Sequence, residues 1–245
     1  MKKLVIILSF LIISTDLYSQ ESFNFDLFNV SLNGQLLQVK GNSGENLYSY
    51  KFHNPSISEY DLDEDGVNEL LVLDSTGVNR KPFYTLYLYN TIDSFYLIDS
   101  ILSGSTEPTE QQSDETGGII IVSGNADFEK FNTDPNPDFL FLPVNCWKYD
   151  GDNLFQVNDE VYNIYESQID DITETIDEAF EDGKKDCETS KKLKSAIAAV
   201  FSDCINAGDK SIASHFVKNY YFCEDINQFL QELNSLTKAE ENASE

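Results

Sequence analysis

The chain is poor in basic side chains: 16 lysines and arginines stand against 43 aspartates and glutamates, and the formal net charge is −27 at pH 7. Proteins that bind nucleic acid draw much of their affinity from lysine and arginine contacts to phosphates, so nucleic acid is excluded as a partner. The expected partner is an unidentified protein or glycan, and the net charge would attract a basic protein in particular.

Recognisable catalytic machinery is also missing from the sequence. There are only two histidines, His53 and His215, and they fall in different predicted regions. The chain has no nucleophile elbow, no paired-histidine zinc motif and no phosphate-binding loop. The sequence therefore favours a non-enzymatic function. A carbohydrate-active enzyme that uses two carboxylates is an alternative, although none of the 43 acids is marked out for that role.

After the first 13 residues the chain has no long apolar run. Residues 1–3 are Met-Lys-Lys, residues 4–13 are apolar except for Ser9, and residues 14–19 turn mostly polar. This is the layout of a secretory signal peptide, and the apolar run is shorter than the roughly 20 residues that span a bilayer. We expect residues 1–19 to be removed and the mature protein to be exported, periplasmic or secreted, with no transmembrane segment. The alternative is a buried strand over residues 4–13.

The composition is otherwise that of a folded protein, with 41% hydrophobic and 13% aromatic residues. Short apolar runs separated by turn residues are typical of β-strands, and they continue to about residue 165. The strongest runs are residues 36–39, 47–52, 70–73, 83–89, 95–98, 119–122 and 139–142. We therefore predict a compact antiparallel β domain over residues 20–165, shaped like a propeller blade or a sandwich. Residues 103–118 are predicted to be a polar surface loop.

From residue 166 onward the apolar residues follow a helical period. Ile169, Ile172, Ile176 and Phe180 would share one helix face, and Gly183 is placed to end that helix. Further helices are predicted over residues 193–204, 212–220 and 226–236. Residues 166–245 should thus form a small α-helical C-terminal region, with a frayed polar tail from residue 238.

The four cysteines are disulfide candidates, because an exported chain meets an oxidising compartment. They are Cys146, Cys187, Cys204 and Cys223, and no two have the C-x-x-C spacing of redox or zinc sites. Four cysteines can pair in three ways, which the sequence does not distinguish. Three of them lie in the last third of the chain, so at least one bridge is expected within that region. Four buried free thiols are the alternative.

One segment, residues 61–69, carries the spacing of a cation site. Its acidic side chains stand at relative positions 1, 3, 5 and 9, which are Asp61, Asp63, Asp65 and Glu69, and a glycine follows at position 6. Calcium takes six to eight oxygen ligands, which alternate carboxylates and the main-chain carbonyl of Val67 can supply. An EF-hand is excluded because its twelfth position, a bidentate glutamate, is a valine in an apolar strand here.

The pattern D-x-D-x-D-G-x-x-E followed by Leu-Leu-Val resembles the calcium loops of FG-GAP and VCBS-type repeats, the blades of integrin-alpha-like propellers. The resemblance covers about 40 residues, since residues 83–98 fit the strand, hairpin and strand that continue such blades. It implies a calcium-stabilised β module with one Ca²⁺, held by Asp61, Asp63, Asp65 and Glu69. A complete propeller needs at least four blades, which about 145 residues cannot supply. Single-module periplasmic proteins that resemble lysozyme inhibitors are a closer architectural match.

Two further observations bear on this site. Residues 130–142 weakly repeat the pattern, but Lys130 and Asn132 stand where Asp61 and Asp63 would be, so we predict one metal ion and not two. The alternative for residues 61–69 is an acidic, solvated turn without metal.

The sequence therefore predicts an exported, calcium-binding recognition module that acts at or outside the cell envelope. An inhibitor or immunity-type protein that blocks a basic envelope hydrolase, such as a lysozyme, is the first alternative. In that case residues 103–118 would enter the cationic cleft of the hydrolase.

Overall fold

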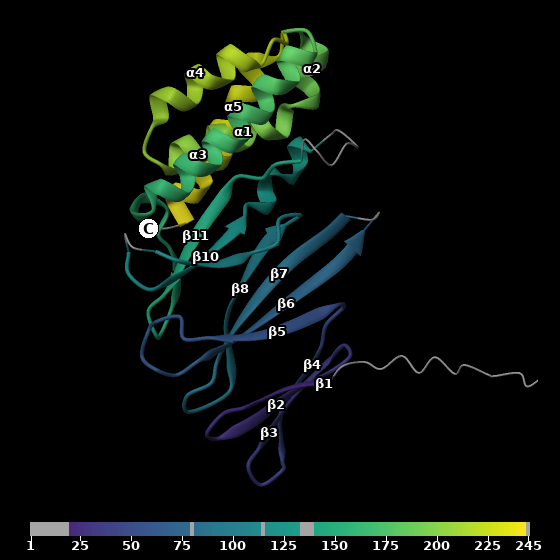
Figure 1. Cartoon of the computed structure of the whole chain (residues 1–245), viewed down its shortest axis with the longest axis vertical. Coiled ribbons are helices and arrows are strands. Elements are labelled where there is room, and N and C mark those ends of the chain that lie inside the picture. The colour runs from purple at the N-terminus through teal and green to yellow at the C-terminus, as the bar shows by residue number, and fades with distance from the viewer. Residues whose placement is uncertain (1–19, 79–80, 114–115, 133–139, 244–245) are drawn as a thin grey trace, which may run out of the picture.

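The structure, a computed structural model, describes residues 20–78, 81–113, 116–132 and 140–243. A stack of antiparallel β-sheets lies below a layer of helices (Figure 1). The predicted fold class, mainly antiparallel β with a C-terminal helical region, is confirmed. The proposed signal peptide, residues 1–19, lies outside the described residues.

The described strands form three four-stranded sheets. The first has the order β1 (Gln20–Asn24), β2 (Phe28–Asn33), β3 (Leu36–Gly41) and β4 (Asn46–Lys51). The second has the order β5 (Pro55–Tyr60), β6 (Glu69–Val78), β7 (Lys81–Asn90) and β8 (Tyr96–Gly104). The third has the order β12 (Leu154–Gln156), β11 (Val144–Tyr149), β10 (Ile119–Gly124) and β9 (Thr109–Gln112).

The second sheet is covered on both faces. Leu70 and Val72 pack against the first sheet, whereas Leu71, between them, packs with Ile121 and Tyr149 of the third sheet. Successive side chains of a strand point to opposite faces, so a strand covered on both sides has to be apolar at every position. This burial explains the unbroken run Leu70-Leu71-Val72-Leu73.

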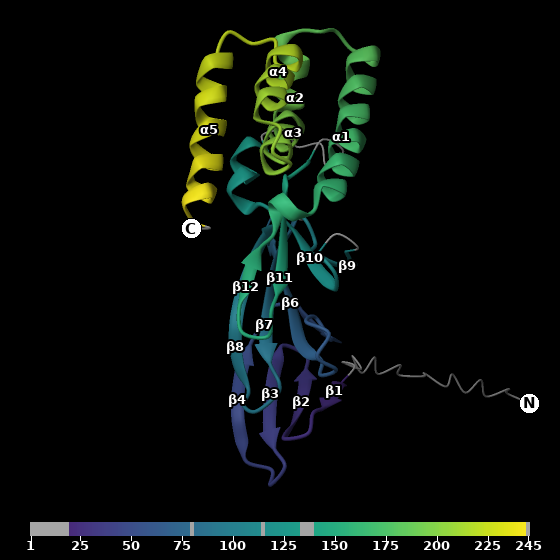
Figure 2. The same ribbon diagram turned by 90° about the vertical axis from the view of Figure 1, so that its left-hand side faces the viewer.

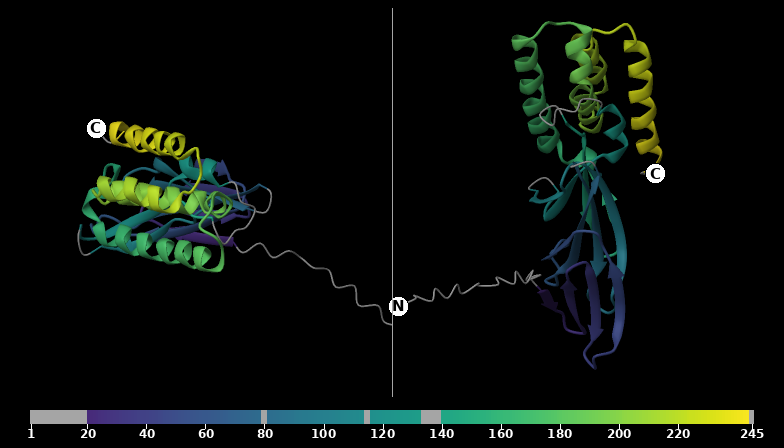
Figure 3. Two further views of the ribbon diagram at one scale, coloured as in Figure 1. Left: turned by 90° about the horizontal axis from the view of Figure 1, so that it is seen from above. Right: turned by 90° about the vertical axis from the view of Figure 1, so that its right-hand side faces the viewer.

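The helices form the opposite end of the molecule from the first sheet (Figures 1 and 2). They are α1 (Tyr162–Asp182), α2 (Cys187–Lys192), α3 (Lys194–Asn206), α4 (Lys210–Tyr220) and α5 (Ile226–Ala243). Figures 2 and 3 show α1 and α5 on either side of α3 and α4. In the part of the chain that the structure describes, no helix is both long enough and apolar enough to cross a bilayer.

Helix α3 is the centre of the helical core. Ten of its residues, from Ser195 to Cys204, are buried. The predicted face of α1 contributes Ile172, Ile176 and Phe180, and the cap at Gly183 ends α1 as expected. Phe128, in the 3-10 helix Ala126–Phe131 that follows β10, belongs to the same core. The helical core therefore includes side chains from the β region.

Buried hydrogen bonds join α3 to β11. The Val144 backbone N–H donates to Asp203 Oδ1 at 3.0 Å, and Asn206 Nδ2 donates to the Val144 carbonyl at 3.3 Å. Asp203 is completely buried. Since buried polar groups of the main chain need partners, these contacts fix α3 on the end of the third sheet.

Three sequence predictions need correction. Residues 140–142 are not a strand, although Leu142 is buried, because this apolar run packs against the helical core without pairing; Phe139 lies outside the described residues. Residues 103–118 are not all surface loop, because Ser103 is buried at the end of β8 and β9 lies within the segment. Helix α5 continues to Ala243, where a frayed tail was expected from residue 238.

One disulfide is present, between Cys187 and Cys223, so the expected bridge within the C-terminal region is confirmed. Cys146 and Cys204 are free and buried, and the prediction of disulfides for them is wrong. Cys146 packs in a core with Val157 and Tyr165, whereas Cys204 packs in the helical core. Burial raises the pKa of each thiol to about 12, which keeps both protonated and unreactive in the folded protein.

Removing the disulfide should destabilise the protein substantially. The two cysteines are 36 residues apart, and closing a loop of that length is expected to contribute about 3 to 4 kcal/mol through the entropy of the unfolded chain. We expect Cys187→Ser/Cys223→Ser to lower the free energy of unfolding in urea by that amount. Cys204→Ser, which breaks no bridge, is the comparison, and equal losses in the two variants would contradict the prediction.

Candidate metal centre

The acidic segment forms a tight loop between β5 and β6, which pair as neighbouring antiparallel strands from Tyr60 and Glu69 onward. Two residues in the loop have positive φ: Gly66 at 91° and Glu64 at 63°. Gly66 takes this conformation without steric cost, and it lets the chain turn back on itself. The strand ends are therefore held together by pairing, and the side chains of the loop can point toward its centre.

Three aspartates converge inside this loop. Asp61, Asp63 and Asp65 each place one carboxylate oxygen within 4.8 Å of the others. Backbone N–H groups of the loop orient the carboxylates. Gly66 donates to Asp61 Oδ2 at 3.0 Å, Asp65 to Asp63 Oδ1 at 3.2 Å, and Val67 to Asp65 Oδ1 at 2.7 Å. The sequence spacing thus brings three of the predicted ligands to one point.

One oxygen of this group lacks a protein partner. Asp61 Oδ1 is buried and accepts no hydrogen bond from the described residues. A buried acceptor without a partner costs about 1 to 3 kcal/mol, and more when it is charged. A cation among the three carboxylates would satisfy this oxygen directly.

Glu69 is buried, whereas the three aspartates are partly or fully exposed. Its residue is only 1% exposed, and its Oε2 accepts the Leu62 N–H at 2.9 Å. Burial raises the pKa of Glu69 to about 7, and repulsion from Asp63 and Asp65 adds to this effect. The hydrogen bond from Leu62 acts in the opposite direction but is outweighed. Burial and the neighbouring aspartates also raise the pKa of Asp63. Without a cation, these carboxylates oppose one another's ionisation.

The third sheet closes one side of the loop. A Cβ atom at Gly151 would lie 2.9 Å from Asp63 Oδ2, so this turn approaches the loop as closely as a glycine permits. Tyr149 is buried and its hydroxyl donates to the Gly151 carbonyl at 2.6 Å. Burial and the charges of Glu69 and Asp63 raise the pKa of the Tyr149 phenol to about 12. The dipeptide Asp150-Gly151 is typical of a hairpin turn, but nothing in the sequence connects this turn to the acidic loop.

Comparison with known proteins adds no assignment. No protein family, curated protein or solved structure matches the chain. The likeness to FG-GAP loops therefore depends on residues 61–98 and on the geometry of the loop. Val67 is 37% exposed, and the coordination role of its carbonyl stays a prediction, as does that of Glu69.

The weak repeat does not reproduce this geometry. Lys130 lies in the last turn of the 3-10 helix Ala126–Phe131 and Asn132 caps it, whereas the aspartates at the matching positions lie in a loop between strands. Residues 134–138 lie outside the described residues. The expectation of a single metal ion stays a prediction.

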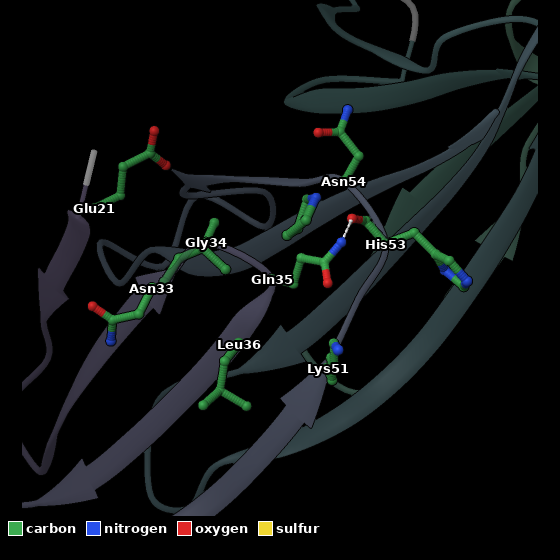
Figure 4. A pocket seen from close by; sticks show the side chains of 10 residues that line it. Glu21, Asn33, Gly34, Gln35, Leu36, Lys51, His53 and Asn54 are labelled. Atoms are coloured by element: carbon green, nitrogen blue, oxygen red, sulfur yellow. Dashed lines mark hydrogen bonds between the residues drawn. The ribbon is translucent and has the colours of Figure 1, made fainter. Parts of the chain in front are cut away.

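The structure reveals a pairing at His53 that the sequence analysis missed. Asp74, on β6, is buried and accepts the backbone N–H groups of His53 and Asn54, at 2.9 and 2.8 Å. Its Oδ2 also lies 3.3 Å from His53 Nδ1. Figure 4 shows the open pocket beside these residues, where Gln35 donates a hydrogen bond to the His53 carbonyl. The side chain of His53 is 76% exposed. His53 and Asn54 lie in the connection from β4 to β5, so the hydrogen bonds from their N–H groups to Asp74 hold this connection between the first and second sheets against β6.

Proposed function

We propose that the chain is an exported calcium-binding β module that acts in recognition at or outside the cell envelope. The observations that carry the calcium part are the convergence of the Asp61, Asp63 and Asp65 carboxylates and the buried oxygen of Asp61 that lacks a partner. Calcium prefers several carboxylate and carbonyl oxygens in a flexible arrangement, whereas magnesium keeps most of its waters. The loop offers oxygens only, which favours calcium.

The ion would act as a structural clamp. It would neutralise carboxylates in a loop that joins β5 to β6 and touches the turn between β11 and β12. Extracellular calcium modules have dissociation constants of about 10⁻⁴ to 10⁻³ M, which suits a compartment with abundant calcium better than intracellular sensing. The disulfide is compatible with the oxidising compartment that export implies.

Calcium should stabilise the purified full chain. At a concentration tenfold above the dissociation constant, one site adds about 1.4 kcal/mol, and the melting midpoint of a chain of this size should rise by about 3 to 5 °C. We expect this rise in calcium relative to chelator, and we expect Asp63→Asn to abolish it. Asp170→Asn, the same change at an exposed position of α1, should retain it. Equal midpoints in calcium and chelator for the unmodified chain would refute the calcium site.

The net charge of −27 supports a basic partner, because opposite charge speeds association. This is the observation that favours the inhibitor hypothesis. The segment proposed to enter a cationic cleft, residues 103–118, contains a paired strand, β9, so its described part is less free to insert than an unpaired loop.

A further inference from the structure

A groove on one side of the molecule is lined by residues of two edge strands. β8 is the last strand of the second sheet and β12 the first strand of the third, and each is hydrogen-bonded to only one strand among the described residues. Residues of both strands line a groove of about 540 Å³. Figure 2 shows β12 and β8 following one another along this side. Exposed strand edges offer unpaired backbone N–H and C=O groups to an incoming strand.

A residue that lines the groove has a buried polar atom without a partner. Asn145, on β11, lines the groove and is 8% exposed, and its Oδ1 accepts no hydrogen bond from the residues that the structure describes. Buried side-chain acceptors are normally satisfied, so this oxygen is open to a donor that the described residues do not supply. The N–H of a bound peptide is such a donor.

The walls of the groove expose apolar side chains. Leu102, on β8, is 56% exposed and Phe155, on β12, is 39% exposed. Trp147 also lines the groove, and its Nε1 donates to Ser123 Oγ at 2.9 Å, which holds the indole in place. Exposed apolar groups around a groove are typical of recognition surfaces. They would receive the apolar side chains of an extended segment.

The charge of the groove selects among possible occupants. Asp127 is the one charged side chain among the lining residues, and Asp99 is exposed on the adjoining part of β8. Since the whole chain carries −27, a second copy would be repelled. A segment with lysine or arginine between apolar residues would be attracted instead.

We propose that the groove between β8 and β12 binds an extended, basic segment of a partner protein by strand addition. Backbone groups of the segment pair with a strand edge, the Asn145 side chain turns to accept an N–H, and apolar side chains contact Leu102 and Phe155. The proposal assigns a surface and a partner chemistry to the recognition function. It uses none of the carboxylates of the acidic loop, so either hypothesis can fail alone.

Trp147 makes the proposal directly testable, because it is the only tryptophan in the chain. The probe is a capped synthetic peptide of alternating valine and lysine, and the comparison peptide alternates valine and glutamate. We expect the lysine peptide to change the Trp147 emission saturably, both in calcium and in chelator, and the glutamate peptide to leave it unchanged. Added salt should weaken the response, because the attraction is partly electrostatic.

Matched variants locate the binding surface. Leu102→Lys places a like charge on the groove wall and should weaken the lysine peptide about tenfold or more. Leu47→Lys makes the same change at a leucine that is 50% exposed on β4, the edge of another sheet, and should bind as the unmodified chain does. Asp127→Asn, which removes a charge without adding bulk, should weaken binding less. Circular dichroism confirms that each variant is folded.

Three results would overturn the proposal. They are the absence of a saturable response to the lysine peptide, an equal response to both peptides, and equal weakening by Leu102→Lys and Leu47→Lys. A concentration-dependent dimer that alters the Trp147 emission without peptide would identify a second copy as the occupant and would also overturn it. The melting response to calcium is measured separately, so its failure is distinguishable from these results.

Discussion

Glu69→Gln should stabilise the metal-free protein at pH 8, although it removes a group that lies in the candidate site. The pKa of Glu69 is raised from 4.5 to about 7 in the folded protein, so the folded state holds the ionised form less well than the unfolded chain does. The metal-free protein therefore loses stability as the pH rises from about 4.5 to 7, and it stays less stable above that range. At 1.36 kcal/mol per unit, the full effect is about 3 kcal/mol.

The glutamine keeps an oxygen for the Leu62 N–H and removes the repulsion from Asp63 and Asp65. Urea unfolding in chelator should show the gain at pH 8 and little of it at pH 4.5. In calcium the order should reverse, because the variant has one carboxylate fewer to offer the ion. Glu178→Gln, at an exposed position of α1, controls for the loss of charge. A Glu69→Gln protein that is less stable than the unmodified chain in chelator at pH 8 would contradict this account.

Asp203→Ala is expected to cost about 3 to 5 kcal/mol of folding free energy. The substitution removes the acceptor for the Val144 N–H at a completely buried position, and it leaves a cavity between α3 and the third sheet. A buried backbone N–H left without an acceptor and a new cavity in the core are both among the more destabilising consequences of a single substitution. Asp203→Asn retains an oxygen at that position and should cost less.

Two probes can follow this unfolding: far-ultraviolet circular dichroism reports the helices, and Trp147 emission reports the third sheet. Because the helical core includes Phe128 and Phe131, we expect both probes to change in a single transition in the unmodified chain. Asp170→Ala, which removes an exposed aspartate of α1, should cost less than about 0.5 kcal/mol. A loss below about 1 kcal/mol in Asp203→Ala would show that the Val144 contact does little to hold α3 in place.

The sequence predicts most reliably those elements whose burial is local and periodic. The stripe Ile172, Ile176 and Phe180 is buried as expected, because a helix sorts its own residues into a core face and a solvent face. The apolar run Leu70-Leu71 is a strand for a related reason: both of its faces are covered. Residues 140–142 show where such prediction fails. In the sequence, an apolar run that packs against helices cannot be distinguished from one that pairs as a strand.

The acidic loop was predictable because its ligands are close in the chain. Spacing alone places Asp61, Asp63 and Asp65 together, and Gly66 permits the turn. The contacts across the fold were not predictable in this way. The approach of Gly151 to Asp63, the pairing of Asp74 with His53 and the groove between β8 and β12 each join segments more than 20 residues apart, and their position depends on how the sheets stack.

The turn at Gly151 gives the two candidate surfaces a mechanical connection. Gly151 lies close to Asp63 Oδ2 on one side, and the strand that follows the turn, β12, carries Phe155, which lines the groove. An ion that draws the aspartates together would tighten this hairpin and so pre-set one wall of the groove. By thermodynamic reciprocity, a segment bound in the groove would then raise the affinity of the loop for its ion by the same factor. If both proposals hold, calcium would strengthen the binding of the segment without being required for it.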